Sequence, residues 1–273
     1  MVRTVTDKET TSKITTANRI AWDEAAPIHA AHNQKNLLLA FSAPGFSCLD
    51  PIETDILKSL GVAGKDVAQV CCNNGCEILS VKNIGAGRCV GFDGSQAFIG
   101  QARELAAAAH LDVSFVCTDV YEIDQRYRGQ FDLVTITIGV ISWMPDLAGF
   151  FDAVASLLKP EGGLFIYEQH PIVDMIEPAP ANAPINWEMS YFSKEPYVET
   201  SGLDYWSGNS YDAKPTTSFL HTLAEVVMAG VNCGLQVEDF AEHPHHISHS
   251  NWNVEASDIG LPMCYTLVLR AAK

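Results

Sequence analysis

The fold is decided by residues 66–95, DVAQVCCNNGCEILSVKNIGAGRCVGFDGS. An apolar run, 67–72, leads into the polar turn Asn73-Asn74-Gly75, and a second apolar run, 89–92, ends on Asp93. This order predicts a strand, a turn, a helix and a second strand. Such a unit brings backbone N–H groups and a helix N-terminus to one edge of a sheet, where a nucleotide-like ligand can bind. An acid at the tip of the next strand can accept hydrogen bonds from both hydroxyls of a ribose.

The turn itself has two interpretations. Asparagine tolerates left-handed backbone conformations better than most residues, so Asn73, Asn74 and Gly75 can follow a path usually given to glycines. The alternative is an ordinary Asn-Gly hairpin turn. Residues 76–84 do not alternate as a returning strand would, and the glycines of 85–87 precede the next apolar run. These features favour a strand–turn–helix unit that cradles a ligand.

Composition limits the range of partners. The 273 residues suffice for one large domain, with or without a substantial insertion, and 47% hydrophobic content is typical of a well-packed globular protein. Acidic residues outnumber basic ones by 33 to 17, which gives a formal charge of −16. Such a surface repels phosphate backbones and anionic lipids. We therefore expect a neutral or cationic small molecule as partner, and neither nucleic acid nor membrane.

Eight cysteines fall mostly in apolar runs and lack paired metal-ligand spacing. Cys71 and Cys72 are strand neighbours that point to opposite faces, so together with Cys76 they make a poor metal site. Buried reduced thiols are the simpler interpretation, and they favour a cytoplasmic protein. The N-terminal residues MVRTVTDKETTSK lack the apolar core of a signal peptide, and no run is long enough to span a bilayer.

Alternating segments predict the remaining core. Strands are expected at 113–117, 131–138 and 164–168, and helices at 95–109 and 145–158. This alternation is typical of an α/β fold with a doubly wound parallel sheet, whose ligands bind at the carboxyl ends of the strands. Those ends lie at Cys72, Asp93, Asp119, Ile138 and Glu168 to His170.

The two ends of the chain carry further elements. Residues 16–32 are predicted to form a helix that breaks near Pro27, and the residues before it are polar and without predicted structure. A last helix is expected at 216–232, followed by strands at 235–240 and 265–271. Only a loop joins these two strands, so the last strand is expected to run antiparallel to its neighbour.

An insertion at 171–215 interrupts the alternation with six prolines and seven large aromatic residues. The aromatic residues are Trp187, Tyr191, Phe192, Tyr197, Tyr205, Trp206 and Tyr211. A long loop with so many rings favours a lid over the acceptor site rather than a surface excursion. The chain is thus expected to divide into a helical cap (1–49), a cofactor-binding core (50–170), the insertion (171–215), and a C-terminal helix and strands that complete the same sheet (216–273).

Residues 65–170 resemble the core of class I S-adenosylmethionine-dependent methyltransferases. The resemblance is carried in order by VCCNNG (70–75), VGFDGS (90–95), FVCTDV (115–120), FDLVTITIGVISWM (131–144) and LLKPEGGLFIYEQHP (157–171). It implies a Rossmann-like methyltransferase fold with a seven-stranded sheet and an antiparallel last strand, and S-adenosylmethionine as cofactor. The series as a whole is much more specific than any one of its members.

The resemblance also implies which residues bind the cofactor. Asp93 would bind the ribose, and Asp119 with Val120 the adenine edge. The turn region would comprise Cys72, Asn73, Asn74, Gly75, Gly94 and Ser95, with Ile138 at the end of its strand. The chain departs from the family at Gln69 and Cys71, where the family has an acid and a glycine, and Gln69 can still accept hydrogen bonds.

Aromatic residues near the N-terminus are further candidates. Trp22 and His29 are seven residues apart, so they share a helical face and can close over the cofactor. Ordinary packing is the alternative for both. A ring from Trp22 or from the insertion would stabilise a sulfonium by cation–π contact, at about 0.5–2 kcal/mol.

His170 is the candidate catalytic residue, as a base or a group that orients the acceptor, because it follows the strand end at Glu168. The alternative is a histidine packed beneath the insertion. The run 242–249, EHPHHISH, is a weak zinc candidate, because Pro244 disrupts helical spacing and no acid or thiol completes a tetrahedral set. We expect no metal, and expect this loop, with Asn251-Trp252, to border the acceptor pocket.

These residues predict a small-molecule methyltransferase, in which alignment of donor and acceptor supplies most of the catalysis. A catalytically degenerate binding or scaffold module of the same fold is the alternative, motivated by the unusual turn. An NAD-dependent oxidoreductase is disfavoured because the G-x-G-x-x-G turn is absent.

Overall fold

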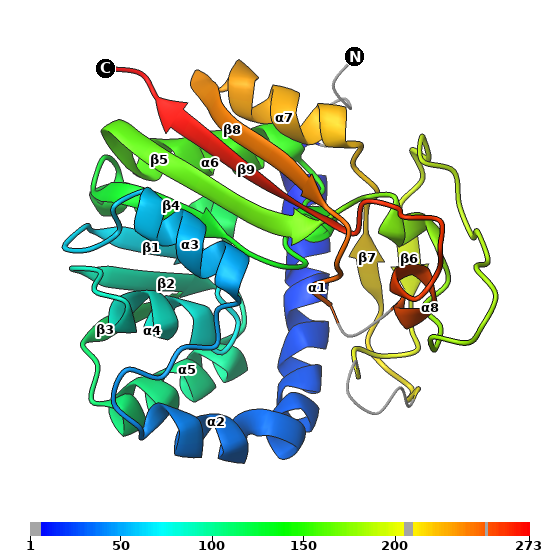
Figure 1. The fold of residues 1–273 in the computed structure, drawn as a ribbon, viewed down its shortest axis with the longest axis horizontal. Helices are drawn as coiled ribbons and strands as arrows, with labels where there is room; N and C mark the ends of the chain where they lie inside the picture. Colours follow the sequence, from blue (N-terminus) through cyan, green and yellow to red (C-terminus); the bar gives the residue numbers. More distant parts are fainter. Residues whose placement is uncertain (1–6, 205–209, 249–250) are drawn as a thin grey trace.

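A computed structural model describes residues 7–204, 210–248 and 251–273. Its centre is a seven-stranded sheet in the order β3-β2-β1-β4-β5-β9-β8 (Figure 1). The strands are β1 (Val67–Val70), β2 (Cys89–Asp93), β3 (Val113–Cys117), β4 (Phe131–Ile136), β5 (Leu158–Gln169), β8 (Leu235–His243) and β9 (Cys264–Ala271). The pairs among β1 to β5 are parallel, and β9 is antiparallel to both β5 and β8. The predicted doubly wound sheet with an antiparallel last strand is confirmed.

Helices cover both faces of this sheet. They are α1 (Lys8–His29), the π-helical turn η1 (Ala30–Gln34), α2 (Lys35–Phe41), α3 (Pro51–Ser59), α4 (Cys76–Asn83), α5 (Gln96–Ala109), α6 (Leu147–Leu157), α7 (Leu223–Asn232) and the short α8 (Trp252–Glu255). Short 3₁₀ turns are η2 (Val120–Glu122), η3 (Gln125–Tyr127), η4 (Ile141–Trp143) and η5 (Val173–Met175). In β1, Ala68 and Val70 pack in the core under α6 and α7, whereas Val67 packs in the core under α3, α4 and α5. Burial on both faces explains why the strands read as continuous apolar runs.

The N-terminal helix is longer than predicted. It begins at Lys8 rather than at residue 16, because the Asp7 side chain accepts a hydrogen bond from the N–H of Thr10 and caps the helix. Its first turns are exposed and polar, so no apolar pattern marked them in the sequence. The helix also continues through Pro27 to His29 instead of breaking before it.

The last helix is shorter than predicted. It begins at Leu223, after a capping box between Thr222 and Glu225, and not at residue 216. Residues Thr216–Ser218 form β7 instead, which pairs antiparallel with β6 (Tyr197–Glu199) in a second, two-stranded sheet. The start of the predicted C-terminal segment therefore joins the insertion.

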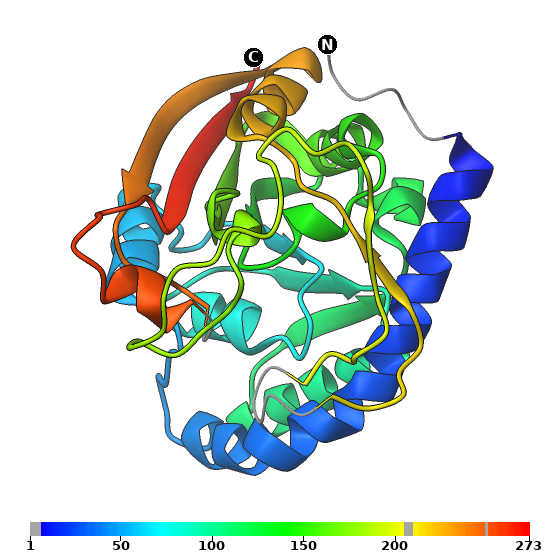
Figure 2. The ribbon, with the colours of Figure 1, turned by 90° about the vertical axis from the view of Figure 1, so that its right-hand side faces the viewer.

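The insertion lies on the far side of α1 from α5, beyond the carboxyl ends of the central strands (Figure 1). In Figure 2, β7 runs beside α1. Two hydrogen bonds connect them, because the Asn18 side chain accepts from the N–H of Thr217 and donates to its carbonyl, both at 2.8 Å. The predicted lid residues Tyr205 and Trp206, and His249, lie outside the described residues.

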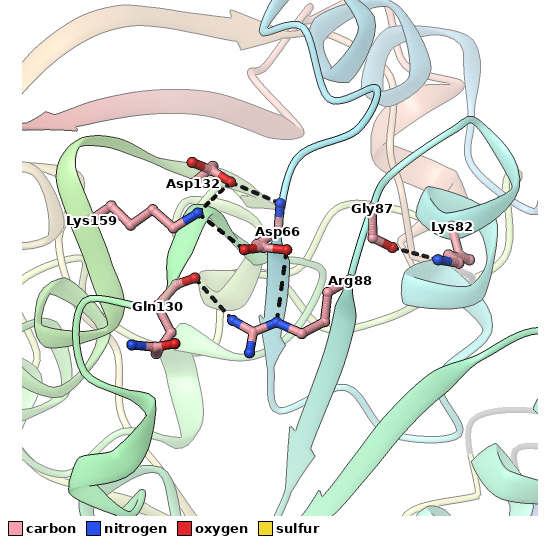
Figure 3. Close-up of polar contacts among 7 residues, drawn as sticks. All are labelled: Asp66, Lys82, Gly87, Arg88, Gln130, Asp132 and Lys159. Carbon is pink, nitrogen blue, oxygen red and sulfur yellow. Dashed lines mark hydrogen bonds and ion pairs between the residues drawn. The ribbon is translucent and has the colours of Figure 1, made fainter.

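The amino-end edge of the sheet carries a compact charge cluster (Figure 3). Asp66 precedes β1 and Asp132 lies in β4. The ammonium of Lys159 lies 3.0 Å from a carboxylate oxygen of Asp66 and 2.9 Å from one of Asp132. Arg88 approaches Asp66 at 3.8 Å. Asp66 and Asp132 therefore each have a cation beside them.

All eight cysteines are free thiols. Across the part of the chain that the structure describes, no helix combines the length and the apolar character needed to cross a membrane.

Candidate active site

Two adjoining cavities open at the carboxyl ends of the parallel strands, where a doubly wound sheet binds its ligands. The small cavity has a volume of about 170 Å³ and the large one about 1540 Å³. They are contiguous, because six residues line both: Trp22, Cys71, Asn73, Ile138, Gly139 and Trp143.

Asp93 ends β2 at the small cavity. One carboxylate oxygen accepts a hydrogen bond from the N–H of Asn73 and the other from the N–H of Ser95, both at 2.8 Å. Burial raises the pKa of Asp93 to about 6, although these two hydrogen bonds oppose the shift. Gly94 and Ser95 line the same cavity, and the Ser95 side chain caps α5 by accepting from the N–H of Phe98.

The turn after β1 has the strained backbone that its sequence suggested. Asn73 has φ +50° and Cys71 has φ +53°, both in the left-handed region. Gly75, at φ +73°, caps α4, and a Cβ atom there would lie 2.5 Å from the Phe115 ring. The close approach and the positive φ together explain why glycine occupies this position. Cys72 and Asn74 line the large cavity.

Asp119 and Val120 line the small cavity at the end of β3. The Asp119 carboxylate accepts hydrogen bonds from the N–H of Tyr121 and from the hydroxyl of Thr15 on α1. Asp119 therefore ties α1 to the sheet edge as well as facing the cavity. The sequence interpretation missed Thr15, because it lies in the polar turns that carried no helical pattern.

Helix α1 forms one wall of both cavities. The Trp22 ring lies 6.0 Å from the His29 ring and 5.5 Å from the Trp143 ring, in edge-on contacts. The Nε2 atom of His29 lies 2.6 Å from the carbonyl oxygen of Leu203. Trp22 thus lines both cavities as a candidate cofactor contact, and His29 lines the large one.

An acid that sequence reasoning missed lies beside the first strand. Gln69 donates from its Nε2 atom to the carboxylate of Glu77 and to the hydroxyl of Thr137, at 2.9 Å for the latter. Thr137 donates to the same Glu77 oxygen at 2.6 Å. Gln69 was expected to accept hydrogen bonds in place of an acid, but its amide instead positions Glu77, which lines the large cavity. Burial raises the pKa of Glu77, against the hydrogen bonds from Thr137 and Gln69.

The large cavity is acidic. Seven carboxylates line it: Asp50, Glu53, Glu77, Glu168, Asp174, Glu199 and Asp204. No Lys or Arg among the described residues does so. Burial, followed by the nearby Glu77 carboxylate, raises the pKa of Glu53 to about 9, and burial raises the pKa of Asp174 to about 7. A cation in this cavity would therefore meet several carboxyl groups and no Lys or Arg among the described lining residues.

Glu168, in β5, holds the segment that follows β4 by hydrogen bonds. Its carboxylate accepts hydrogen bonds from the backbone N–H groups of Gly139, Val140, Ile141 and Gln169. These contacts shape the segment after β4, so that Gly139, with Ile138 beside it, lines both cavities. Glu168 makes no contact of this kind with His170.

His170 lies two residues after Glu168, outside the lining of both cavities. Its Nε2 atom is 2.9 Å from a carboxylate oxygen of Glu242, and its Nδ1 atom accepts a hydrogen bond from the N–H of Ile172. The ring is buried edge-on against Tyr265, and the residue is not among those that line either cavity. Burial lowers the pKa of His170, partly offset by Glu242. Its catalytic role stays a prediction, and these contacts favour a structural one.

The histidines of 243–248 make separate contacts. His243 pairs with the Thr266 hydroxyl, His245 with the Tyr167 hydroxyl, and His246 with Glu255. Only His246 of these three lines the large cavity. Over the described residues, no three His, Cys, Asp or Glu side chains gather as a metal ion would require, and His249 lies outside that range.

Comparison with known proteins agrees with this architecture. Residues 67–162 match the family model described as a methyltransferase domain. The matched segment runs from β1 into β5 and contains the turn, Asp93 and Asp119. The sheet order is that of the class I, Rossmann-like methyltransferase fold, and residues 67–162 are similar to a methyltransferase domain.

Among curated proteins, the chain is similar to a ubiquinone biosynthesis O-methyltransferase of Bradyrhizobium diazoefficiens. They are 31% identical over 143 residues, which is 52% of this chain and 53% of that protein. A protein of the same name from Nitrobacter winogradskyi is 26% identical over 159 residues, 58% of this chain and 59% of that protein. The chain spans about half the length of the curated relatives it matches.

Solved structures show a similar fold over a larger part of the chain. An S-adenosylmethionine-dependent methyltransferase from Mesorhizobium loti superposes with a TM-score of 0.59 at 18% identity, over 79% of this chain and 96% of that one. A structure described as a putative methyltransferase of the same kind, from Listeria monocytogenes, also has a TM-score of 0.59, at 15% identity, over 81% and 97%. The likeness therefore includes most of the central sheet and not the matched segment alone.

Proposed function

We propose that this chain transfers a methyl group from S-adenosylmethionine to a small-molecule acceptor. The observation that carries the proposal is the Asp93 carboxylate, held at the small cavity by the N–H groups of Asn73 and Ser95. Each of its oxygens keeps a lone pair for one ribose hydroxyl. The methyltransferase-domain match and the names of the curated relatives support the same chemistry.

The two cavities suit two substrates. We assign the adenosine to the small cavity, with Asp93, Gly94, Ser95, Asp119 and Val120 around it. The methionyl part and the acceptor would share the large cavity. Its volume of about 1540 Å³ exceeds the roughly 300–1,000 Å³ of a typical single-ligand pocket.

Glu77 is our candidate for the methionyl ammonium. The family's acid on the first strand is replaced here by Gln69, whose amide hydrogens are directed to Glu77 and Thr137. Glu77 then presents its remaining lone pairs to the large cavity from the first turn of α4. The carboxylate would thus be supplied eight residues further along the chain, from a helix instead of a strand.

The charge of the large cavity supports an acceptor without negative charge. An anionic acceptor would meet the seven lining carboxylates without a Lys or Arg from the described lining residues to pair with it. The names of the curated relatives support oxygen as the acceptor atom. The acidic composition favours a small molecule over nucleic acid, and a cytoplasmic location remains a prediction.

The chain's own contribution to the reaction would be alignment and a suitable electrostatic environment. When bound, S-adenosylmethionine supplies a methyl group on a positively charged sulfur. Trp22 and Trp143 line both cavities, where their rings can stabilise that charge by about 0.5–2 kcal/mol. Orienting the acceptor in line with the methyl group, with the reacting atoms about 3 Å apart, would supply most of the rate gain.

Isothermal titration calorimetry with S-adenosylmethionine tests this proposal. We expect binding by the wild-type chain, and a loss of about 100-fold or more in Asp93→Ala, because two hydrogen bonds to a charged group are removed. Affinity should also fall as the pH drops below about 6, where Asp93 takes up a proton and loses acceptor capacity. The matched control is Asp112→Asn, an exposed acid before β3 at the opposite edge of the sheet. No heat at millimolar ligand, or equal binding by Asp93→Ala, would contradict the proposal.

A catalytically degenerate binding module is the second candidate. Cys71 and Asn73 favour it, because side chains at these two left-handed positions occupy space beside the methionyl end. Tight cofactor binding without methylation of any compound in a broad acceptor library would support it. The oxidoreductase hypothesis predicts that reduced nicotinamide cofactor binds at the same site. A fluorescence titration with that cofactor tests it.

A further inference from the structure

One histidine of the run 243–248 has an arrangement that the proposed function does not yet use. The Nδ1 atom of His246 lies 3.1 Å from a carboxylate oxygen of Glu255, on α8. The ring packs edge-on against Trp252, with the ring centroids 4.1 Å apart. The His246 side chain is only 10% exposed, so both contacts fix a largely buried ring.

The contact with Glu255 favours one position for the proton on the neutral His246 ring. A carboxylate oxygen can only accept from a ring nitrogen, so its place 3.1 Å from Nδ1 favours a hydrogen on Nδ1. In the neutral ring, Nε2 is then left with a free lone pair. This is the arrangement in which a second group fixes the orientation of a histidine ring.

The Nε2 atom of His246 has no hydrogen-bond partner among the described residues. It is buried and makes no hydrogen bond to any described residue, while the residue lines the large cavity. A buried ring nitrogen without a partner is costly, and a ligand hydroxyl in the cavity would satisfy it. The Nε2 atoms of the other two histidines on this lining are occupied, because His29 contacts the carbonyl of Leu203 at 2.6 Å and His221 that of Met144 at 2.8 Å.

We propose that His246 is the catalytic base that removes the acceptor's proton, and that Glu255 is its positioning residue. The inference rests on the proposed methyl transfer. The acceptor oxygen forms a bond to the methyl carbon, the bond between that carbon and sulfur breaks, and its electron pair stays on sulfur. The proton of the acceptor hydroxyl moves to Nε2 of His246, and the resulting imidazolium is stabilised by the Glu255 carboxylate. His246 later returns the proton to water.

This assignment narrows the acceptor to a compound whose attacking atom carries a proton. A phenol is the simplest example, because its hydroxyl is largely protonated near neutral pH and gains nucleophilicity when a base removes the proton. Transfer to a positioned base typically accelerates such a step by about 10²–10⁴-fold. A tertiary amine or a thioether, which loses no proton, would derive no benefit from His246.

The test uses the full chain, S-adenosylmethionine, and dopamine and catechol as probe acceptors, with methylated product measured by mass spectrometry. We expect His246→Gln to lower kcat by about 10²–10⁴-fold while cofactor affinity by calorimetry stays within twofold. Its remaining rate should keep rising with pH, because ionised catechol no longer needs the base. Glu255→Gln should lower kcat less and change the pH profile in the same direction. His110→Asn, an exposed histidine at the end of α5, is the control.

Nitrogen-detected NMR of the histidine rings supplies a readout that needs no acceptor. The proposal predicts that neutral His246 carries its proton on Nδ1 in the wild type, and that Glu255→Gln weakens this preference. A proton on Nε2, or an unchanged kcat in His246→Gln, would overturn the proposal. Absence of S-adenosylmethionine binding by the wild-type chain would contradict the proposed methyltransferase function. The NMR result would still show whether the proton of neutral His246 lies on Nδ1, beside Glu255.

Discussion

The acidic residues at the amino-end and carboxyl-end edges of the central sheet differ in their partners and in their pKa values. At the amino-end edge, Asp66 and Asp132 flank the ammonium of Lys159, with Arg88 nearby (Figure 3). Partial burial there is outweighed by Lys159 and the N–H of Asp66, and the pKa of Asp132 is lowered. Both acids are paired with cations, which is the ordinary arrangement for a structural edge.

At the carboxyl-end edge, burial outweighs the interactions that lower the pKa values of the acids. Burial raises the pKa values of Asp93, Glu77, Glu53 and Asp174. The hydrogen-bond partners of Asp93, Glu77 and Asp174 are backbone N–H groups, a hydroxyl or side-chain amides. Carboxyl groups of this kind are poised to bind a positive charge or a hydroxyl donor. On the proposed function, the sulfonium and ammonium groups of S-adenosylmethionine would bring positive charge into the large cavity.

Among the three variants that test this contrast between the two edges, the largest effect is expected for Glu77→Gln. If Glu77 binds the methionyl ammonium, removal of its charge should lower the affinity for S-adenosylmethionine by about 10–100-fold, as for the loss of one charge-assisted hydrogen bond. Affinity for adenosine alone should be unchanged, because Asp93 is intact. Calorimetry with both ligands measures the difference. Equal losses for the two ligands would mean that Glu77 acts through the fold and not through the ammonium.

A smaller effect is expected in the pH dependence of stability. Glu53 has a folded-state pKa of about 9, above its ordinary 4.5, so its stabilising contribution is complete below pH 4.5 and is lost as the pH rises toward 9. Without ligand, the free energy of unfolding should therefore fall across this range, by at most about 1.4 kcal/mol per pH unit for one such group. Glu53→Gln should flatten the slope in urea titrations at pH 6 and pH 8.5. An unchanged slope would show that Glu53 ionises normally.

The smallest effect is expected at the opposite edge. Lys159→Met removes the cation between Asp66 and Asp132, and the three side chains are each about one-third exposed, so the loss should be about 1 kcal/mol of unfolding free energy. Affinity for S-adenosylmethionine should not change. A change in affinity above threefold would contradict the separation of a structural edge from a binding edge.

Much of the fold was predictable because its signals are local. The alternation of strands and helices predicted the sheet, and the expectation that only a loop joins the last two strands predicted the direction of the last one. The start of α1 was missed because Asp7 caps a polar, exposed segment, and the start of α7 was missed because Thr216–Ser218 pairs with β6, 17 to 21 residues away in the chain. Contacts of this kind leave no periodic pattern.

Less of the site was predictable, because several of its contacts join side chains that are distant in the chain. Asp93 and Asp119 follow strands, so their place at the sheet edge could be deduced. Thr15 reaches Asp119 across 104 residues, and Gln69 directs Glu77 through a side-chain contact that neither residue signals alone. His246 stood out in the sequence as one of a run, but only its contact with Glu255 separates it from its neighbours.

Proton exchange on cofactor binding tests the central claim most directly. Calorimetric titrations of S-adenosylmethionine at pH 7, in buffers of different ionisation enthalpy, give the number of protons that binding releases or takes up. If the carboxyl groups of the large cavity await a cation, the bound ligand will lower their pKa values and protons will be released. Binding with no net release, or with proton uptake, would contradict the account.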